Sequence, residues 1–174
     1  MIEKKSLIAG DVLLYGRTPF KESAIGWFFG LIINIKTWSK YCHVEVYNGA
    51  GTSLASRDGV GVGCYPLRLA QIEKVRRPSA LDYDHRAAVR WFRKVEGQPY
   101  DFVGLLSFGL NKTKLAIQRL CKIKPSDMQF CSEFATRLYR RAGLDPFNPE
   151  FDADKVSPAQ FDQSPVFRTV WKRR

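Results

Sequence analysis

A β-hairpin is predicted by residues 43 to 56, HVEVYNGAGTSLAS. The run from His43 to Tyr47 alternates polar and apolar side chains, and the turn-forming letters NGAG follow it directly. Because this turn returns the chain into a second extended run at residues 53 to 56, the two runs should pair antiparallel. Strand parity puts His43, Glu45 and Tyr47 on one face. The hairpin therefore predicts an antiparallel sheet.

Other short segments extend this sheet and add helices to it. We expect strands at residues 10–15, 64–67, 72–77 and 166–172, and helices at 22–35, 84–96, 101–121 and 127–142. The last helix should end at Gly143, with Pro146 beyond it. This order predicts an α+β fold with a largely antiparallel sheet packed against helices. With no internal repeat and no long linker, residues 1–174 are expected to form a single domain.

The chain is strongly basic. Its formal net charge is +11, from 28 Lys and Arg against 17 Asp and Glu. Such a surface favours polyanions or anionic lipid headgroups as partners, although a solvated basic surface has the same composition. The start, MIEKKSLIAGD, lacks the apolar core of a secretory signal peptide, and the apolar runs at 24–33 and 102–110 are too short to span a bilayer. We therefore expect a cytoplasmic protein.

Neither a disulfide framework nor a metal centre is expected. Without an export signal, free thiols are expected at all four cysteines, which are Cys42, Cys64, Cys121 and Cys131. No pair of them has the spacing of zinc ligands, and the only histidines are His43 and His85. The sequence thus predicts no metal and no cofactor.

Cys131 lies near the predicted start of a helix in the segment QFCSEFATRLYRRAG, residues 129–143. Ser126 and Gln129 fit a capping box that begins the helix near Asp127 and leaves Cys131 in or just after its first turn. A helix N-terminus and a nearby imidazole both favour a thiolate, which makes Cys131 a candidate nucleophile. A free cysteine is also a common core residue, so the residue type alone leaves both interpretations open. His43 is far away in sequence and can act on Cys131 only if the fold brings them together.

The order of several short motifs resembles a known group of proteins. The motifs are GDVLLY at 10–15, Ser23 and Ile25, YCHVEVY at 41–47, a glycine-rich hairpin, YDFVGLL at 100–106, FCSEFA at 130–135 and SPAQF at 157–161. Their order resembles the circularly permuted branch of the NlpC-type papain-like superfamily. That branch includes the YiiX-like proteins and, more distantly, the lecithin retinol acyltransferase group. Chains with H-V-E and F-C-S-E motifs also occur among bacteriophage proteins, which this chain resembles.

This resemblance implies a permuted papain-like fold and a thiol-dependent hydrolase or acyltransferase. Carried over to this chain, it implies that Cys131 is the nucleophile and His43 the general base. The backbone N–H of Cys131 would bind the oxyanion, and the resemblance suggests that Tyr41 helps. The implied substrates are amides, esters or thioesters, including peptidoglycan peptides for the wider superfamily and lipid or acyl substrates for the permuted branch.

The group that orients His43 is where this chain departs from the family. The family places a polar residue on the adjacent hairpin strand, where this chain has Ala55. A one-residue change of hairpin register could bring Ser53 or Ser56 to the imidazole instead. Glu45 lies on the same face as His43. Because it is two residues further along the same strand, its carboxylate would have to fold back to reach the imidazole.

A second interpretation comes from a different class of function. The chain could be an inactive papain-like scaffold that binds nucleic acid or an anionic membrane through its Lys and Arg surface, with Cys131 and His43 vestigial. The sequence leaves the bond cleaved, the acyl acceptor and the oligomeric state open.

Overall fold

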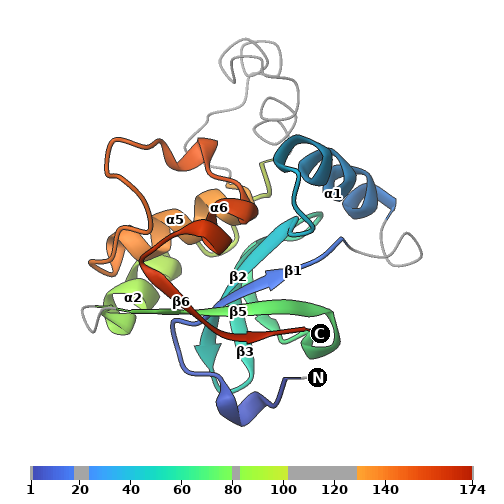
Figure 1. Cartoon of the computed structure of the whole chain (residues 1–174). Helices are drawn as coiled ribbons and strands as arrows, with labels where there is room; N and C mark the ends of the chain where they lie inside the picture. The colour runs from blue at the N-terminus through green and yellow to red at the C-terminus, as the bar shows by residue number, and fades with distance from the viewer. Residues whose placement is uncertain (1, 18–23, 80–82, 102–128, 174) are drawn as a thin grey trace, which may run out of the picture.

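The structure is a computed structural model that describes residues 2–17, 24–79, 83–101 and 129–173 (Figure 1). The elements along these residues are η1 (Lys4–Ser6), β1 (Val12–Tyr15), α1 (Ala24–Thr37), β2 (His43–Gly49), β3 (Thr52–Arg57), β4 (Gly61–Pro66), η2 (Leu69–Gln71), β5 (Ile72–Pro78), α2 (His85–Val95), α5 (Cys131–Arg141), η4 (Ala153–Lys155), α6 (Pro158–Gln163) and β6 (Phe167–Lys172). The expected helix at 101–121 and the expected capping residue Ser126 lie almost entirely outside the described residues.

The strands form a six-stranded sheet in the order β4-β3-β2-β1-β5-β6. Every neighbouring pair is antiparallel, which confirms the α+β prediction and the largely antiparallel sheet. The predicted hairpin is β2–β3, paired through Val46 with Leu54 and Tyr47 with Ser53. Its turn places Gly49, Ala50 and Gly51 at positive φ, a region that glycine adopts without steric cost. The hairpin lies beside β1 and carries both His43 and Glu45.

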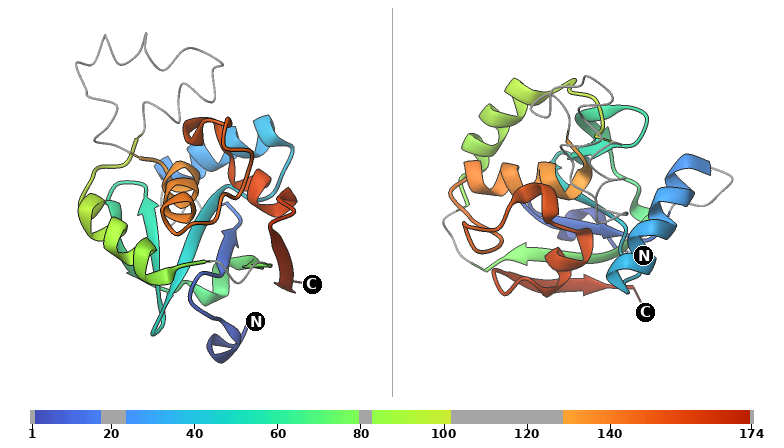
Figure 2. Two further views of the ribbon diagram at one scale, coloured as in Figure 1. Left: turned by 90° about the vertical axis from the view of Figure 1, so that its left-hand side faces the viewer. Right: turned by 90° about the horizontal axis from the view of Figure 1, so that it is seen from above.

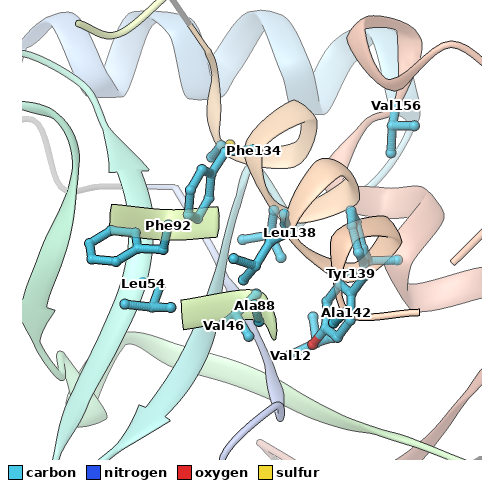
Figure 3. Close-up of a cluster of buried hydrophobic side chains, with 14 of the residues drawn as sticks. Val12, Val46, Leu54, Ala88, Phe92, Phe134, Leu138, Tyr139, Ala142 and Val156 are labelled. Carbon is cyan, nitrogen blue, oxygen red and sulfur yellow. The ribbon is translucent and has the colours of Figure 1, made fainter. Parts of the chain in front are cut away.

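Helices cover one face of this sheet. Helix α5 packs on β2 and β3, α2 packs on α5, and α6 contacts β1. Figures 1 and 2 show α5 lying between α2 and α6. The apolar residues between these helices and the sheet form the larger core cluster, and Figure 3 labels Val12, Val46, Leu54, Ala88, Phe92, Phe134, Leu138, Tyr139, Ala142 and Val156 among them. Cys131 belongs to the same cluster, at the first residue of α5.

The opposite face of the sheet is also covered. A second cluster contains Ile2, Leu7, Leu13, Tyr15, Tyr47, Ile72 and Val75. Strand β1 is buried at all of its positions because Val12 and Leu14 face the helices while Leu13 and Tyr15 face this second cluster. Glu45 lies on β2 beside Tyr15, so a charged side chain is buried at the centre of the sheet.

Helix α5 begins later than the sequence predicts. Its first residue is Cys131, and its N-cap is Phe130, which makes no side-chain capping bond. The predicted start near Asp127 with a Gln129 capping box is therefore wrong. Gln129 instead forms a parallel bridge with Tyr100, and its backbone exchanges hydrogen bonds with the segment from Pro99 to Asp101. These bonds hold Gln129 in an extended conformation, and Cys131 becomes the first helical residue.

Helix α6 was not predicted, although its signal is present in the sequence. Ser157 and Gln160 form a capping box around Pro158, which is the first helical residue. Within the described ranges, no helix is long and apolar enough to cross a bilayer.

Candidate active site

Cys131 combines burial with a position at a helix N-terminus. Its side chain is 1% exposed. The first backbone hydrogen bond of α5 runs from the N–H of Phe134 to the carbonyl of Phe130 at 2.9 Å. The N–H groups that precede it in the helix have no acceptor within the helix and carry the positive end of its dipole. Negative charge is therefore favoured at Cys131.

Two serines fix the start of α5 in place. Ser56 on β3 donates a 2.5 Å hydrogen bond to the carbonyl of Gln129, two residues before Cys131. Ser132 donates a 2.6 Å hydrogen bond to the carbonyl of Val156, just before α6. Both serines are fully buried. The backbone around Cys131 is thus tied to the sheet on one side and to the C-terminal segment on the other.

His43 lies between Cys131 and Glu45. It is the first residue of β2, and its side chain is 14% exposed. Its Nε2 lies 3.1 Å from Oε1 of Glu45. Burial alone would lower the pKa of His43, but the charge and side-chain hydrogen bond of Cys131, followed by those of Glu45, raise that pKa to about 9. This raised pKa favours the protonated imidazole at neutral pH.

Glu45 is fully buried and enclosed by hydrogen-bond donors. Oε1 accepts from Nε of Arg57 at 2.8 Å and from Nη2 of Arg68 at 3.0 Å. Oε2 accepts from Ser53 Oγ at 2.5 Å, Tyr15 Oη at 3.0 Å and Nη2 of Arg57 at 3.1 Å. Such complete pairing is what a buried carboxylate requires to remain charged.

The ionisation of Glu45 follows from this environment. Burial alone would raise the pKa of Glu45, but hydrogen bonds and charges from His43 and Arg57 outweigh it and hold that pKa well below its usual value. The carboxylate is therefore ionised at neutral pH and can stabilise an imidazolium. Of the three candidates that the sequence left for the group beside the imidazole, Glu45 is the one whose side chain contacts His43.

The three candidates contact different groups. The carboxylate of Glu45 folds back to His43 along the same strand, and Arg57 on the neighbouring strand donates to that carboxylate. Ser53 supports Glu45 rather than the imidazole, and Ser56 supports Gln129. Ala55, which lies on β3 between these two serines in sequence, is fully buried.

The tyrosine that interacts with Cys131 is Tyr100, which the sequence analysis did not single out. Burial, together with the charge and a side-chain hydrogen bond of Cys131, raises the pKa of Tyr100 well above its ordinary value. Tyr41, the expected oxyanion helper, packs into the same core cluster as Cys131. Burial and the nearby Asp162 and Glu73 raise the pKa of Tyr41 to about 12. Tyr100 is the first residue of the YDFVGLL motif, and this position is the feature of the sequence that could have identified it.

A small cavity adjoins the cysteine. Its volume is about 10 Å³, and besides Cys131 it is lined by Ile33, Phe130, Ser132, Val156, Ser157 and Pro158. A space of this size holds about one water molecule. Most of the lining is apolar, so a group placed here would meet hydrocarbon rather than charge.

The described residues contain free cysteines and no group of side chains that could hold a metal ion. Cys42, Cys64 and Cys131 are free, and Cys121 lies outside the described residues. In the part of the chain that the structure describes, no three His, Cys, Asp or Glu side chains are grouped to hold a metal ion.

Fold and site together define a class: an α+β protein in which a strand histidine joins a cysteine at a helix N-terminus to a buried glutamate. Comparison with models of known protein families finds no match, and comparison with curated proteins finds none either.

Proposed function

We propose that this protein is a cysteine hydrolase or acyltransferase that uses Cys131 as nucleophile and His43 as general acid and base. Glu45 orients His43 and stabilises its protonated form. The observation that carries the proposal is the position of His43, which contacts Glu45 through Nε2 and interacts with Cys131. The resemblance to the permuted papain-like superfamily supports the same roles for Cys131 and His43.

The reaction would begin from a thiolate and an imidazolium. The sulfur of Cys131 attacks a carbonyl carbon of an amide, ester or thioester, and the carbonyl oxygen becomes an oxyanion. Backbone N–H groups at the start of α5, including that of Cys131, would stabilise this charge. His43 then donates its proton to the leaving group, and the carbon–leaving-group bond breaks to give a thioester on Cys131.

The second half of the reaction releases the acyl group. Water or another acceptor attacks the thioester while His43 removes the proton of the acceptor, and the thiolate of Cys131 leaves. Glu45 stabilises the imidazolium in both halves, because its carboxylate is fixed against the ring by Arg57. Tyr100, which interacts with the sulfur, can stabilise the thiolate through its hydroxyl.

The cavity beside Cys131 indicates which kind of acyl group the site would accept. Its lining favours an uncharged, apolar acyl group over a charged one. This is compatible with the lipid or acyl substrates that the resemblance implies for the permuted branch, and with the uncharged part of a peptide. Because the cavity has room for only about one water molecule, side chains of its wall must move to admit a substrate.

Labelling with a thiol-reactive probe tests the proposal. The exposed Cys64 would react in any case, so the experiment uses a Cys64→Ser background and assigns the labelled residue by peptide mass spectrometry. At neutral pH we expect Cys131 to be labelled rapidly, and about a hundredfold more slowly in His43→Ala. His85→Ala, which removes the other histidine, is the matched control and should leave the rate unchanged. Slow labelling that does not depend on His43 would overturn the proposal in favour of the inactive scaffold.

A further inference from the structure

A second pocket lies between α2 and α5. It has a volume of about 320 Å³ and is lined by Trp91, Arg137, Arg140 and Arg141. Figure 2 shows the two helices side by side. At a rise of about 1.5 Å per residue, its arginines lie roughly 9 to 15 Å along the helix axis from Cys131. The pocket shares no lining residue with the cavity beside Cys131, so the two are separate.

The three arginines form one basic face of α5. Positions 137, 140 and 141 are spaced i, i+3 and i+4, which places their side chains together on a helix surface. Arg137 donates to Glu133 at 2.7 Å. Arg141 is exposed. Helix α5 thus presents a cluster of guanidinium groups on one side of the pocket.

Arg140 is held by the loop that follows α5. Its Nε donates to Asp145 at 3.0 Å, and its Nη2 donates to the carbonyls of Asn148 and Phe151. Two carboxylates, Glu133 and Asp145, therefore pair with two of the three guanidinium groups at this pocket, those of Arg137 and Arg140. The pocket keeps an excess of positive charge, and one of its guanidinium groups is already fixed in position.

Trp91 supplies the aromatic part of the lining. Its indole stacks on Phe134 of α5, with ring centroids 5.8 Å apart and an interplanar angle of 29°. The ring is partly buried, and Phe134 holds it against α5. A rigid aromatic surface beside guanidinium groups is the arrangement on which nucleic-acid bases stack while their phosphates bind arginine.

We propose that the pocket between α2 and α5 binds a nucleotide unit, with its phosphate on the arginines and its base on Trp91. Its volume is within the range of small-ligand pockets. Because the chain carries a net charge of +11, a polyanion is attracted to its surface as a whole, which favours single-stranded nucleic acid as the source of that unit. A free nucleotide has the same chemistry and is the other source. The inference does not depend on the chemistry of Cys131.

Fluorescence anisotropy of a labelled oligothymidylate with the full chain tests this inference. Arg141→Ala should weaken binding roughly tenfold, because one charged phosphate contact is lost. It should also reduce the slope of log K against log salt concentration by about 0.7. The matched control is Arg168→Ala, which removes the same charge from an exposed position on β6 and should change binding less than about twofold.

Further variants and probes separate the contribution of base stacking from that of overall charge and identify the kind of ligand. Trp91→Leu should weaken binding at least about fivefold through lost base stacking, with circular dichroism to check the fold. Thymidine 5′-phosphate that displaces the oligonucleotide at low concentration identifies the free nucleotide as a ligand, while displacement by oligonucleotides alone identifies the strand. Equal losses in Arg141→Ala and Arg168→Ala would overturn the inference, because binding would then follow overall charge. Binding to phosphatidylglycerol vesicles without binding to the oligonucleotide would overturn it as well.

Discussion

The carboxylate of Glu45 lies 3.1 Å from the imidazole of His43, although the two residues are only two positions apart on the same strand. Neighbouring side chains on one face of a strand are roughly 6 to 7 Å apart at the backbone, so both side chains must lean toward each other. Arg57 makes this possible by holding the carboxylate through both of its oxygens. The carboxylate that contacts the imidazole therefore comes from the strand of the histidine itself.

Glu45→Gln should weaken both the fold and the reactivity of Cys131. The amide keeps the shape but not the charge, so Arg57 and Arg68 lose their buried counter-ion. We expect the free energy of unfolding to fall by about 3 kcal/mol, measured by urea denaturation at neutral pH. Labelling of Cys131 should slow at least tenfold, because an amide does not stabilise the imidazolium of His43 as a carboxylate does.

The matched control for that change is Glu73→Gln on β5. Glu73 is 21% exposed and pairs with Lys40 and Arg173 near the surface, so its loss should cost about 0 to 1 kcal/mol. Acid pH gives a second check. Folding lowers the pKa of Glu45, so its contribution to stability is complete above the unfolded value of 4.5 and is lost as the pH falls. Equal acid sensitivity of the wild type and Glu45→Gln would contradict the role of this carboxylate.

The two histidines should titrate at opposite ends of the accessible pH range. The pKa of His43 is raised to about 9, whereas burial lowers the pKa of His85 below its ordinary value of 6.5. Proton NMR of the two imidazoles measures both midpoints in one sample. Cys131→Ser should lower the midpoint of His43 and leave that of His85 unchanged, because only His43 interacts with the sulfur.

The same shift predicts how stability depends on alkaline pH. The pKa of His43 is higher in the folded state than the unfolded value of 6.5, so protonation of His43 favours folding. This contribution is complete below pH 6.5 and is lost as the pH rises through about 9. Denaturation curves of the wild type and His43→Ala should therefore converge in this interval. Curves that stay equally far apart from pH 6.5 to pH 9 would show that His43 is not charged in the folded protein.

The sheet could be predicted because its signals are local. Alternation and glycine-rich turns marked the hairpin β2–β3, and the predicted antiparallel sheet is confirmed. The start of α5 was missed because its cause is not local. Gln129 is held outside the helix by Ser56 on β3 and by the segment around Tyr100, neither of which is near it in sequence.

Only part of the candidate site could be predicted, because its remaining contacts join residues that are distant in sequence. Cys131 and His43 were chosen from residue type, strand parity and resemblance, and the structure brings them together. The choice among Ser53, Ser56 and Glu45 depended on where Arg57 and Arg68 lie, since these two arginines fix the carboxylate. Arg68 follows β4, and no local pattern of the sequence indicates that its side chain returns to Glu45.

Tyr100→Phe should reduce the reactivity of Cys131 more than Tyr41→Phe does. The hydroxyl of Tyr100 interacts with the sulfur, whereas burial, followed by the charges of Asp162 and Glu73, acts on Tyr41. We expect Tyr100→Phe to slow labelling of Cys131 roughly tenfold at mildly acid pH, where the thiolate depends most on its hydrogen-bond donors. Tyr41→Phe removes the same group from a second buried tyrosine and should leave the labelling rate unchanged. Equal effects in the two variants would argue against a direct role of Tyr100.

Two glycines, one at the first position of β4 and one just before that strand, test how the segment before the site is supported. Gly61 has a φ of +96°, and a Cβ added there would lie 2.2 Å from the carbonyl oxygen of Gln98. That carbonyl accepts the backbone N–H of Val62 at 2.8 Å, and the side chain of Gln98 bonds Gln129. Gly61→Ala should therefore push Gln98 away and lower the free energy of unfolding by about 3 kcal/mol in urea denaturation.

Gly59→Ala is the matched control for this prediction. Gly59 also has a positive φ, of +75°, but a Cβ added there meets nothing within 4 Å. Its substitution should cost about 1 kcal/mol from backbone strain alone. Because Gln98 leads to Tyr100 and contacts Gln129, Gly61→Ala should also slow the labelling of Cys131, while Gly59→Ala should not. Comparable losses of stability and labelling in both variants would show that strain, rather than the contact with Gln98, limits substitution at Gly61.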